Sequence, residues 1–349
     1  MRTLRSDNNA GLCPEALLAI QKANDESHQH GYGDDVFTRD AKAAFGKIFG
    51  PDCGVFFVAT GTAANTLAIA ALTEPWQTVI CHSHAHLNDN ESTAPERITH
   101  CRTMAIHTES SKLTPDKITQ AISHQRGDVH QPQPGVVTIS NPSEFGTIYS
   151  PEEMATICKV AHETGFRVHV DGARFANAVA SLDCDPKALS IEAGVDALSF
   201  GGTKNGMAGG EAILLFAQGD GQAHAKAMAA LPFHRKGTGH LLSKHRFLSA
   251  PFTATLRNGV WLKHAAHANA MARRLADGLS AMGMRPRFEC QTNGVFVSIT
   301  EQIDQALQAA GHEYYRLGDA AWNMVRLMCS FDTDPKEIDA FLADAQKAC

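Results

Sequence analysis

Two segments that each end a predicted strand carry the charged side chains best placed to do chemistry in this chain. Residues 168–174 deliver Asp171 and then Arg174 at the carboxyl end of a β-type run. Residues 196–206 form another short strand that opens into glycines around Lys204. Ligands of open α/β sheets lie beyond the carboxyl ends of the strands, so we expect these charged groups to share a crevice. A lysine and a carboxylate there suit pyridoxal phosphate, which takes a Schiff-base amine and an anionic partner for its ring nitrogen.

Each member of this pair also has a simpler interpretation. Aspartate often caps a helix, and Asp171 could serve the next helix in that way. Lys204 could be a solvated surface lysine. Its neighbours are unusually small for a surface, because they include Gly201, Gly202, Gly206, Gly209 and Gly210. We therefore favour a functional role for both residues, with Asp171 ionised beside a cationic cofactor ring.

A phosphate site is predicted where the strand over 54–59 passes into a helix. Gly61 allows close backbone approach, the free amides of the first helical turn bind anions, and the Thr62 hydroxyl adds a donor. Thr203, beside the lysine, could donate to the same phosphate. An ordinary strand-to-helix turn would look the same, and the neighbouring acid–lysine pair is what favours a phosphate cradle.

Three histidines, His82, His84 and His86, alternate directly after a predicted strand. In an extended segment they would share a face, so a metal site is one interpretation. No nearby cysteine or second ligand set completes it, and a chain with 18 histidines forms such clusters by chance. We expect no metal here, and we expect His86 to stack on a cofactor ring.

Two arginines are candidates to hold the carboxylate of an amino acid. Arg174 follows Asp171 by three residues, and Arg326 interrupts the apolar strand over 324–328. An unpaired buried charge is costly, so Arg326 is unusual as a core residue. The alternative is an edge strand from which Arg326 reaches water.

The composition is that of an ordinary globular protein: 349 residues, 44% hydrophobic, 19% charged, with a net charge of −6. That charge gives no sign of nucleic-acid binding. No apolar run approaches the roughly 18 residues of a membrane span, and the first residues lack the apolar stretch of a signal peptide. A cytoplasmic location is expected.

The nine cysteines are scattered without a Cys-x-x-Cys pair. This pattern favours buried reduced thiols over disulfides or a zinc site, with Cys349 exposed.

Short β-rich runs alternate with helical stretches over the first two-thirds of the chain, which predicts an α/β fold with a mostly parallel sheet covered on both faces. The predicted strands of this sheet are 54–59, 78–81, 136–140, 167–171, 197–200 and 212–216. Predicted helices cover 62–72, 151–164 and a long region of about 241–282. Strands over 294–298 and 324–329, with helices over 303–310 and 334–347, predict a small α+β domain. We divide the chain into a large domain over 1–250, with an amino-terminal arm, and a small domain over 251–349.

These motifs together resemble the threonine aldolase family, pyridoxal-phosphate enzymes of the aspartate-aminotransferase fold (fold type I) within the wider β-eliminating lyase group. The resemblance covers nearly the whole chain. It is carried by residues 5–7, 33–35, 60–62, 85–86 with Glu91, 112–115, 169–174 and 201–207. It implies a large, seven-stranded-type sheet domain, a small carboxyl-terminal domain and a homotetramer with active sites at dimer interfaces.

The resemblance also implies residue roles. Lys204 would form the Schiff base with pyridoxal 5'-phosphate, and Asp171 would pair with the ring nitrogen. The residues expected to contact the cofactor are Gly61, Thr62, His86, Asp171, Arg174, Thr203, Lys204 and Arg246. Arg246 would reach a phosphate, across a subunit boundary. The residues expected to bind the substrate are Ser6, His86, Arg174 and Arg326.

The implied reaction is aldol cleavage of L-threonine, L-allo-threonine or a related L-β-hydroxy-α-amino acid such as phenylserine, to glycine and an aldehyde. His86, or a water held by His86 and Glu91, is the expected base for the β-hydroxyl proton. The chain departs from the usual family pattern at residues 6–8, 140–144 and 236–240, which leaves the preferred substrate open. A β-eliminating lyase acting on another L-amino acid is the alternative. An amino-acid-sensing module is a weaker one, because such a module normally carries a DNA-binding region.

Overall fold

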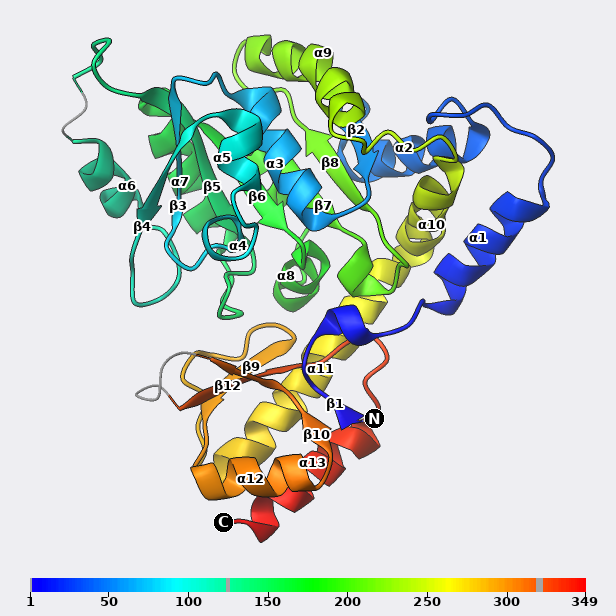
Figure 1. Ribbon diagram of the computed structural model, residues 1–349, viewed down its shortest axis with the longest axis vertical. Coiled ribbons are helices and arrows are strands. Elements are labelled where there is room, and N and C mark those ends of the chain that lie inside the picture. Colours follow the sequence, from blue (N-terminus) through cyan, green and yellow to red (C-terminus); the bar gives the residue numbers. More distant parts are fainter. Residues whose placement is uncertain (1, 124–125, 318–322) are drawn as a thin grey trace.

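A seven-stranded sheet forms the centre of the larger part of the molecule (Figure 1). The structure is a computed structural model that describes residues 2–123, 126–317 and 323–349. The strand order is β2-β8-β7-β6-β5-β3-β4. Strand β8 is antiparallel to both of its neighbours, and the other pairs are parallel. The strands are Gly54–Val58 (β2), Gln77–His82 (β3), Arg102–Ile106 (β4), Gln133–Ser140 (β5), Arg167–Gly172 (β6), Ala197–Gly201 (β7) and Glu211–Leu215 (β8).

All six strands predicted for this sheet are present, and the mostly parallel α/β architecture is confirmed. The seventh strand, β4, was not predicted. It lies at the edge of the sheet and none of its residues is buried, so it lacks the continuous apolar run by which a central strand is recognised.

Helices cover both faces of this sheet, as the alternation of side chains along β2 illustrates (Figure 1). Val55 and Phe57 belong to a core shared with α2, α7 and α8, whereas Phe56 and Val58 belong to a core shared with α3 and α9. The helices of the larger part are Pro14–Asp25 (α1), Val36–Phe49 (α2), Gly61–Leu72 (α3), His86–Asp89 (α4), Ala94–Thr99 (α5), Pro115–Ile122 (α6), Pro151–Glu163 (α7), Phe175–Leu182 (α8), Gln222–Gly237 (α9) and Arg246–Leu256 (α10).

The long helical region predicted over about 241–282 is two helices rather than one, α10 and Val260–Ala281 (α11). Between them lies a 3₁₀ turn over Arg257–Gly259, in which Asn258 and Gly259 have φ values of 55° and 67°. Left-handed backbone cannot continue a right-handed helix, and asparagine and glycine are the residues that adopt it most readily. The break lets α10 pack against α1 and α2 while α11 runs on to the smaller part (Figure 1).

The smaller part is built on a three-stranded antiparallel sheet, in the order β11-β12-β9. Its strands are Gly294–Ser298 (β9), Tyr315–Leu317 (β11) and Met324–Met328 (β12), and its helices are Glu301–Ala309 (α12) and Pro335–Lys347 (α13). The amino terminus joins this part, because Arg2–Thr3 (β1) pairs in parallel with His312–Glu313 (β10) and Leu4 lies in its core. The predicted boundary after residue 250 falls within α10, and the two-domain division stays a prediction.

No helix among the described residues combines the length and the apolar character needed to cross a bilayer. The nine cysteines are free thiols, and Cys349 is the exposed one.

Candidate active site

One cavity of about 530 Å³ gathers side chains from both parts of the molecule. That volume lies within the range of roughly 300–1,000 Å³ typical of small-molecule sites. The sequence-predicted residues that line it are Ser6, Gly61, His86, Glu91, Asp171, Arg174, Lys204 and Arg326.

Asp171 and Lys204 meet because β6 and β7 are parallel neighbours. Asp171 is the penultimate residue of β6, and Lys204 lies in the 3₁₀ turn Thr203–Asn205 just beyond β7. Burial, reinforced by the charge of Arg174, lowers the pKa of Lys204, which increases the fraction of neutral, nucleophilic amine. Burial alone would raise the pKa of Asp171, but Lys204 and the Ala173 N–H at 3.0 Å outweigh it and leave that pKa lowered.

Asn65 connects the two acids of the cavity. Its Nδ2 donates to Asp171 Oδ2 and to Glu91 Oε1, each at 2.8 Å. Asn65 is only 2% exposed, so these hydrogen bonds are shielded from water. We assigned it no role from the sequence, although it follows Gly61 by four residues and so lies on the same helix face.

His86 and Glu91 form a hydrogen-bonded pair, with 2.8 Å between Nδ1 and Oε1. The Glu91 side chain is completely enclosed. Its hydrogen bond is the main cause that raises the pKa of His86, and burial raises the pKa of Glu91 itself. The expectation that His86 shares a face with His82 and His84 is wrong. His82 ends β3 and its ring lies 5.5 Å from that of His84, whereas His86 begins α4 and turns to Glu91.

Arg174 is held by a residue of the amino-terminal arm. Its Nε and Nη2 donate to the Asp7 carboxylate at 2.6 and 2.9 Å, and Asn293 Nδ2 donates to the same carboxylate at 3.0 Å. Asp7 takes one edge of the guanidinium and so fixes its plane. Asp7 had no role in the sequence interpretation, although it adjoins Ser6, which lines the cavity and caps the turn Asp7–Asn9.

Arg326 lies on β12, the central strand of the small sheet, so the edge-strand alternative is wrong. Its Nη2 donates to the Arg5 carbonyl at 3.3 Å, and its guanidinium carbon lies 4.8 Å from the centre of the Tyr315 ring. Its Nε is buried without a hydrogen-bond partner. Burial and the charge of Arg174 lower the pKa of Arg326, as expected for two cations that face the same cavity.

Glu144 is a further acid of the cavity that sequence reasoning missed. Its Oε1 accepts hydrogen bonds from the His86 backbone N–H at 3.1 Å and from the Ser140 hydroxyl at 3.2 Å. It lies in residues 140–144, where the chain departs from the usual family pattern. No family motif therefore indicated it.

Thr62, Thr203 and Arg246 are not among the described residues that line the cavity. Thr62 is the second residue of α3, and Arg246 begins α10 with its Nε buried and unpartnered. The Thr203 hydroxyl bonds to Glu211, whose carboxylate also accepts the Gly202 N–H at 2.6 Å. The predicted phosphate contacts of these three residues stay predictions.

The donors of the cavity fit pyridoxal phosphate. A side-chain carbon built on Gly61 would meet no atom within 4 Å, so the first turn of α3 is open to an anion. Lys204 supplies a buried amine and Asp171 a buried carboxylate at the same cavity.

Comparison with known proteins shows the family and the fold of the chain. A model of the β-eliminating lyase family matches residues 3–302. A low specificity L-threonine aldolase of Pseudomonas sp. (strain NCIMB 10558) is 42% identical over 342 residues, which are 97% of this chain and 95% of that relative. The threonine aldolase structure of Leishmania major superposes with a TM-score of 0.91 at 26% identity, covering 99% of this chain and 98% of that one. Serine palmitoyltransferase from S. paucimobilis, solved with bound PLP, shares the fold, with a TM-score of 0.70 at 17% identity over 99% of this chain and 86% of that one.

Proposed function

This chain belongs to the β-eliminating lyase family, and we propose that it is a carbon–carbon lyase that cleaves L-threonine, L-allo-threonine or related L-β-hydroxy-α-amino acids to glycine and an aldehyde. The observation that carries the proposal is the buried pair Lys204 and Asp171 at one cavity with Arg174 and Arg326. The similarity to low specificity L-threonine aldolase supports the reaction type. Pyridoxal phosphate is the proposed cofactor, and when bound it supplies the electron sink for the bond that breaks.

The two arginines and Ser6 bind and orient the substrate. Arg174, fixed by Asp7, and Arg326 present guanidinium groups to the cavity from opposite parts of the molecule. A carboxylate held by both, with Ser6 nearby, fixes the amino acid against the Lys204 side of the cavity. Binding therefore requires the larger and smaller parts to be correctly placed.

His86 is the proposed base for the β-hydroxyl proton. Its Nδ1 is bound to Glu91, which leaves Nε2 as the ring nitrogen that can take a proton from substrate or from a water. The raised pKa of His86 matches this role, because the histidinium that forms is stabilised by Glu91.

A homotetramer built as a dimer of dimers is part of the same proposal, as is a cytoplasmic location. In that assembly we propose that Arg246 reaches the phosphate of a neighbouring subunit; it is not among the described residues that line its own cavity.

A product panel distinguishes this reaction from the alternative. Purified, cofactor-saturated enzyme is given L-threonine, L-allo-threonine, L-phenylserine and L-serine, and the products are identified by chromatography. The proposal predicts glycine with acetaldehyde or benzaldehyde. Keto acid and ammonia from these substrates, without glycine, would instead identify a β-eliminating lyase.

A further inference from the structure

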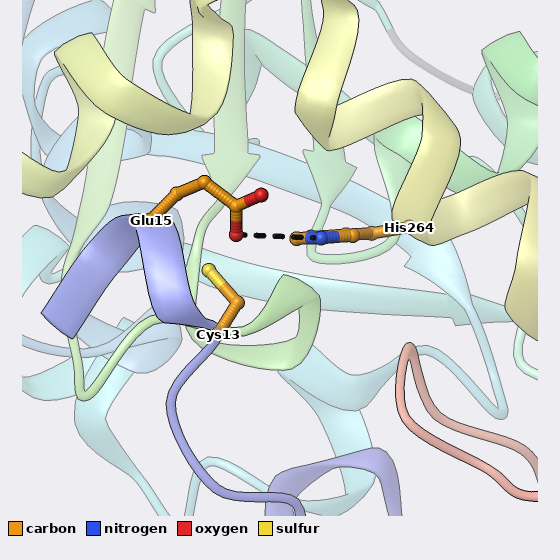
Figure 2. Close-up of side chains that lie close together, drawn as sticks. All are labelled: Cys13, Glu15 and His264. Carbon is orange, nitrogen blue, oxygen red and sulfur yellow. Dashed lines mark ion pairs between the residues drawn. The ribbon is translucent and has the colours of Figure 1, made fainter. Parts of the chain in front are cut away.

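A second group of ligand-type side chains lies outside the cavity, where the amino-terminal segment meets α11 (Figure 2). Cys13 caps α1, Glu15 is the second residue of that helix, and His264 lies in the second turn of α11. One sulfur, one carboxylate oxygen and one ring nitrogen all lie within 4.8 Å of one another. Among the described residues, no other group of three such side chains gathers this closely.

Two polar atoms of this group lack a hydrogen-bond partner, whereas the Cys13 sulfur interacts with Glu15 and with the Ala16 backbone. Glu15 Oε2 and His264 Nδ1 are both buried without a hydrogen bond. The His264 Nε2 lies 3.8 Å from Glu15 Oε2, which is an ion-pair distance but too long for a hydrogen bond (Figure 2). Cys13 is 0% exposed. Buried polar groups normally have hydrogen-bond partners, so these two atoms are free to bind a ligand.

We propose that Cys13, Glu15 and His264 bind one Zn²⁺ ion. Thiolate, carboxylate and imidazole are the three ligand types that zinc uses in proteins, and a water would complete the tetrahedron. Bonds of about 2.0–2.3 Å place tetrahedral ligands roughly 3.3–3.8 Å apart, so donors that now lie up to 4.8 Å apart need to close by about 1.5 Å at most. The Glu15 side chain is 39% exposed and can make this adjustment.

The position of the group gives the metal a structural consequence. The Cys13 N–H donates to the Gly206 carbonyl at 2.8 Å, two residues beyond Lys204. In the same turn, Asn205 Nδ2 donates to the Trp261 carbonyl of α11 at 2.9 Å. Zinc would therefore tie the start of α1 to α11 behind the turn that carries the lysine. This inference rests on the geometry of the group and is independent of the proposed reaction.

Binding must displace the thiol proton. Zinc binds cysteine as the thiolate, so coordination releases the Cys13 thiol proton to solvent. The scattered cysteines favoured buried reduced thiols in the sequence analysis. His264 lies about 250 residues from Cys13 and Glu15, so no sequence spacing could indicate this group.

The test measures zinc on the cofactor-saturated enzyme. Protein washed with chelator and then desalted is equilibrated with ZnCl₂, desalted again, and its zinc content measured by mass spectrometry. We expect one zinc per chain in the wild type. Glu15→Gln and His264→Gln should each lower zinc affinity at least about tenfold, since even changes beyond the ligands cost about 10–100-fold. Cobalt should give a thiolate-to-metal absorption band that Cys13→Ser abolishes.

A matched control comes from the histidines that follow β3. The His107 ring lies 6.0 Å from that of His82 and 5.9 Å from that of His84, and His107→Gln removes a histidine that is outside the proposed ligand group. It should leave the zinc unchanged. Retained cofactor absorbance shows that each variant is folded, and if Cys13→Ser does not fold, Glu15→Gln decides the matter, because its side chain is partly exposed. The proposal is overturned if the wild type retains no zinc, if Glu15→Gln and His264→Gln bind it as the wild type does, or if His107→Gln alone abolishes it.

Discussion

A continuous line of hydrogen bonds runs through the candidate site, from His86 to Glu91, from Glu91 to Asn65 and from Asn65 to Asp171. The line joins the proposed base to the acid proposed to hold the cofactor ring. In a buried site such bonds strengthen one another, and each group fixes the orientation of the next. The protonation state of His86 and the charge of Asp171 are therefore coupled.

Glu91→Gln tests the first bond of this line. Because the hydrogen bond to Glu91 is the main cause that raises the pKa of His86, its loss should lower that pKa. A base is active when deprotonated, so the acid limb of the kcat/KM profile should move to lower pH. The measurement is a pH–rate profile on threonine for both proteins. An unmoved acid limb would remove His86 from the role of base.

Asn65→Ala tests the middle of the line. It removes two hydrogen bonds to acids, each worth about 1.5–3 kcal/mol, so cofactor binding should weaken by about tenfold or more. The matched control is Asn177→Ala, which removes a buried asparagine that pairs with Asn269 at 2.9 Å, outside the lining of the cavity. Cofactor titrations of both variants by absorbance provide the comparison. Equal affinity in the two would show that Asn65 serves only packing.

The sequence indicated the residues that directly follow a predicted strand or begin a predicted helix. Asp171 and Lys204 each follow a strand, and Gly61 opens a helix, so their place at the cavity follows from the order of the elements along the chain. Asp7 and Glu144 could not be found in that way. Asp7 pairs with Arg174, which lies 167 positions away in the sequence. Glu144 lies in a loop whose path no local pattern specifies.

At the scale of elements, strand β8 holds the turn that carries Lys204. Glu211, the first residue of β8, accepts the Gly202 N–H and the Thr203 hydroxyl from that turn. Burial raises the pKa of Glu211 to about 7, from an ordinary value of 4.5. The native state therefore keeps a proton that the unfolded chain loses.

Glu211→Gln tests this arrangement through stability. The contribution of the protonated acid is complete below the unfolded pKa of about 4.5 and is lost as pH rises towards 7, at about 1.4 kcal/mol per pKa unit. Glutamine cannot ionise but still accepts the Gly202 N–H. Between pH of about 5 and about 8, the free energy of unfolding of the variant should therefore exceed that of the wild type by up to about 3 kcal/mol. Urea denaturation of the cofactor-free proteins across this range measures it. Parallel stability curves would refute the raised pKa.

Elements were predicted well where one physical signal dominated. Strands β2, β7 and β8 are buried along their whole length and were visible as apolar runs. The break between α10 and α11 was not predicted, because the hydrophobic periodicity continues through it and only Asn258 and Gly259 mark it. Strand β4 was hidden by its exposure at the sheet edge.

At the scale of the whole molecule, the two parts meet at the cavity through a buried ion pair. Arg174 follows β6, Asp7 belongs to the amino-terminal arm, and Asn293 precedes β9. The Asp7 side chain is 1% exposed and that of Arg174 19%, so the charges are shielded from solvent. Sequence spacing predicted two parts but not this link between them.

Asp7→Asn should destabilise the enzyme by about 3–5 kcal/mol, because it leaves the Arg174 charge buried without its partner. The KM for threonine should rise as well, since Arg174 loses the contact that fixes its plane. The control is Asp339→Asn, which breaks the pair with Arg274. The Asp339 side chain is 52% exposed and that of Arg274 49%, so this change should lower the free energy of unfolding by less than about 1 kcal/mol. Urea denaturation and steady-state kinetics on each variant are the measurements. Similar small losses in both would show that the Asp7 pair is not a structural link.

The central claim is that Lys204 is the amine that holds pyridoxal phosphate. Borohydride reduction of the cofactor-loaded enzyme fixes the link between lysine and cofactor, and peptide mass spectrometry locates it. We predict the pyridoxyl label on Lys204 alone, with no label in Lys204→Ala. A label on another lysine, or a wild-type enzyme that takes up none, would contradict the assignment of this site.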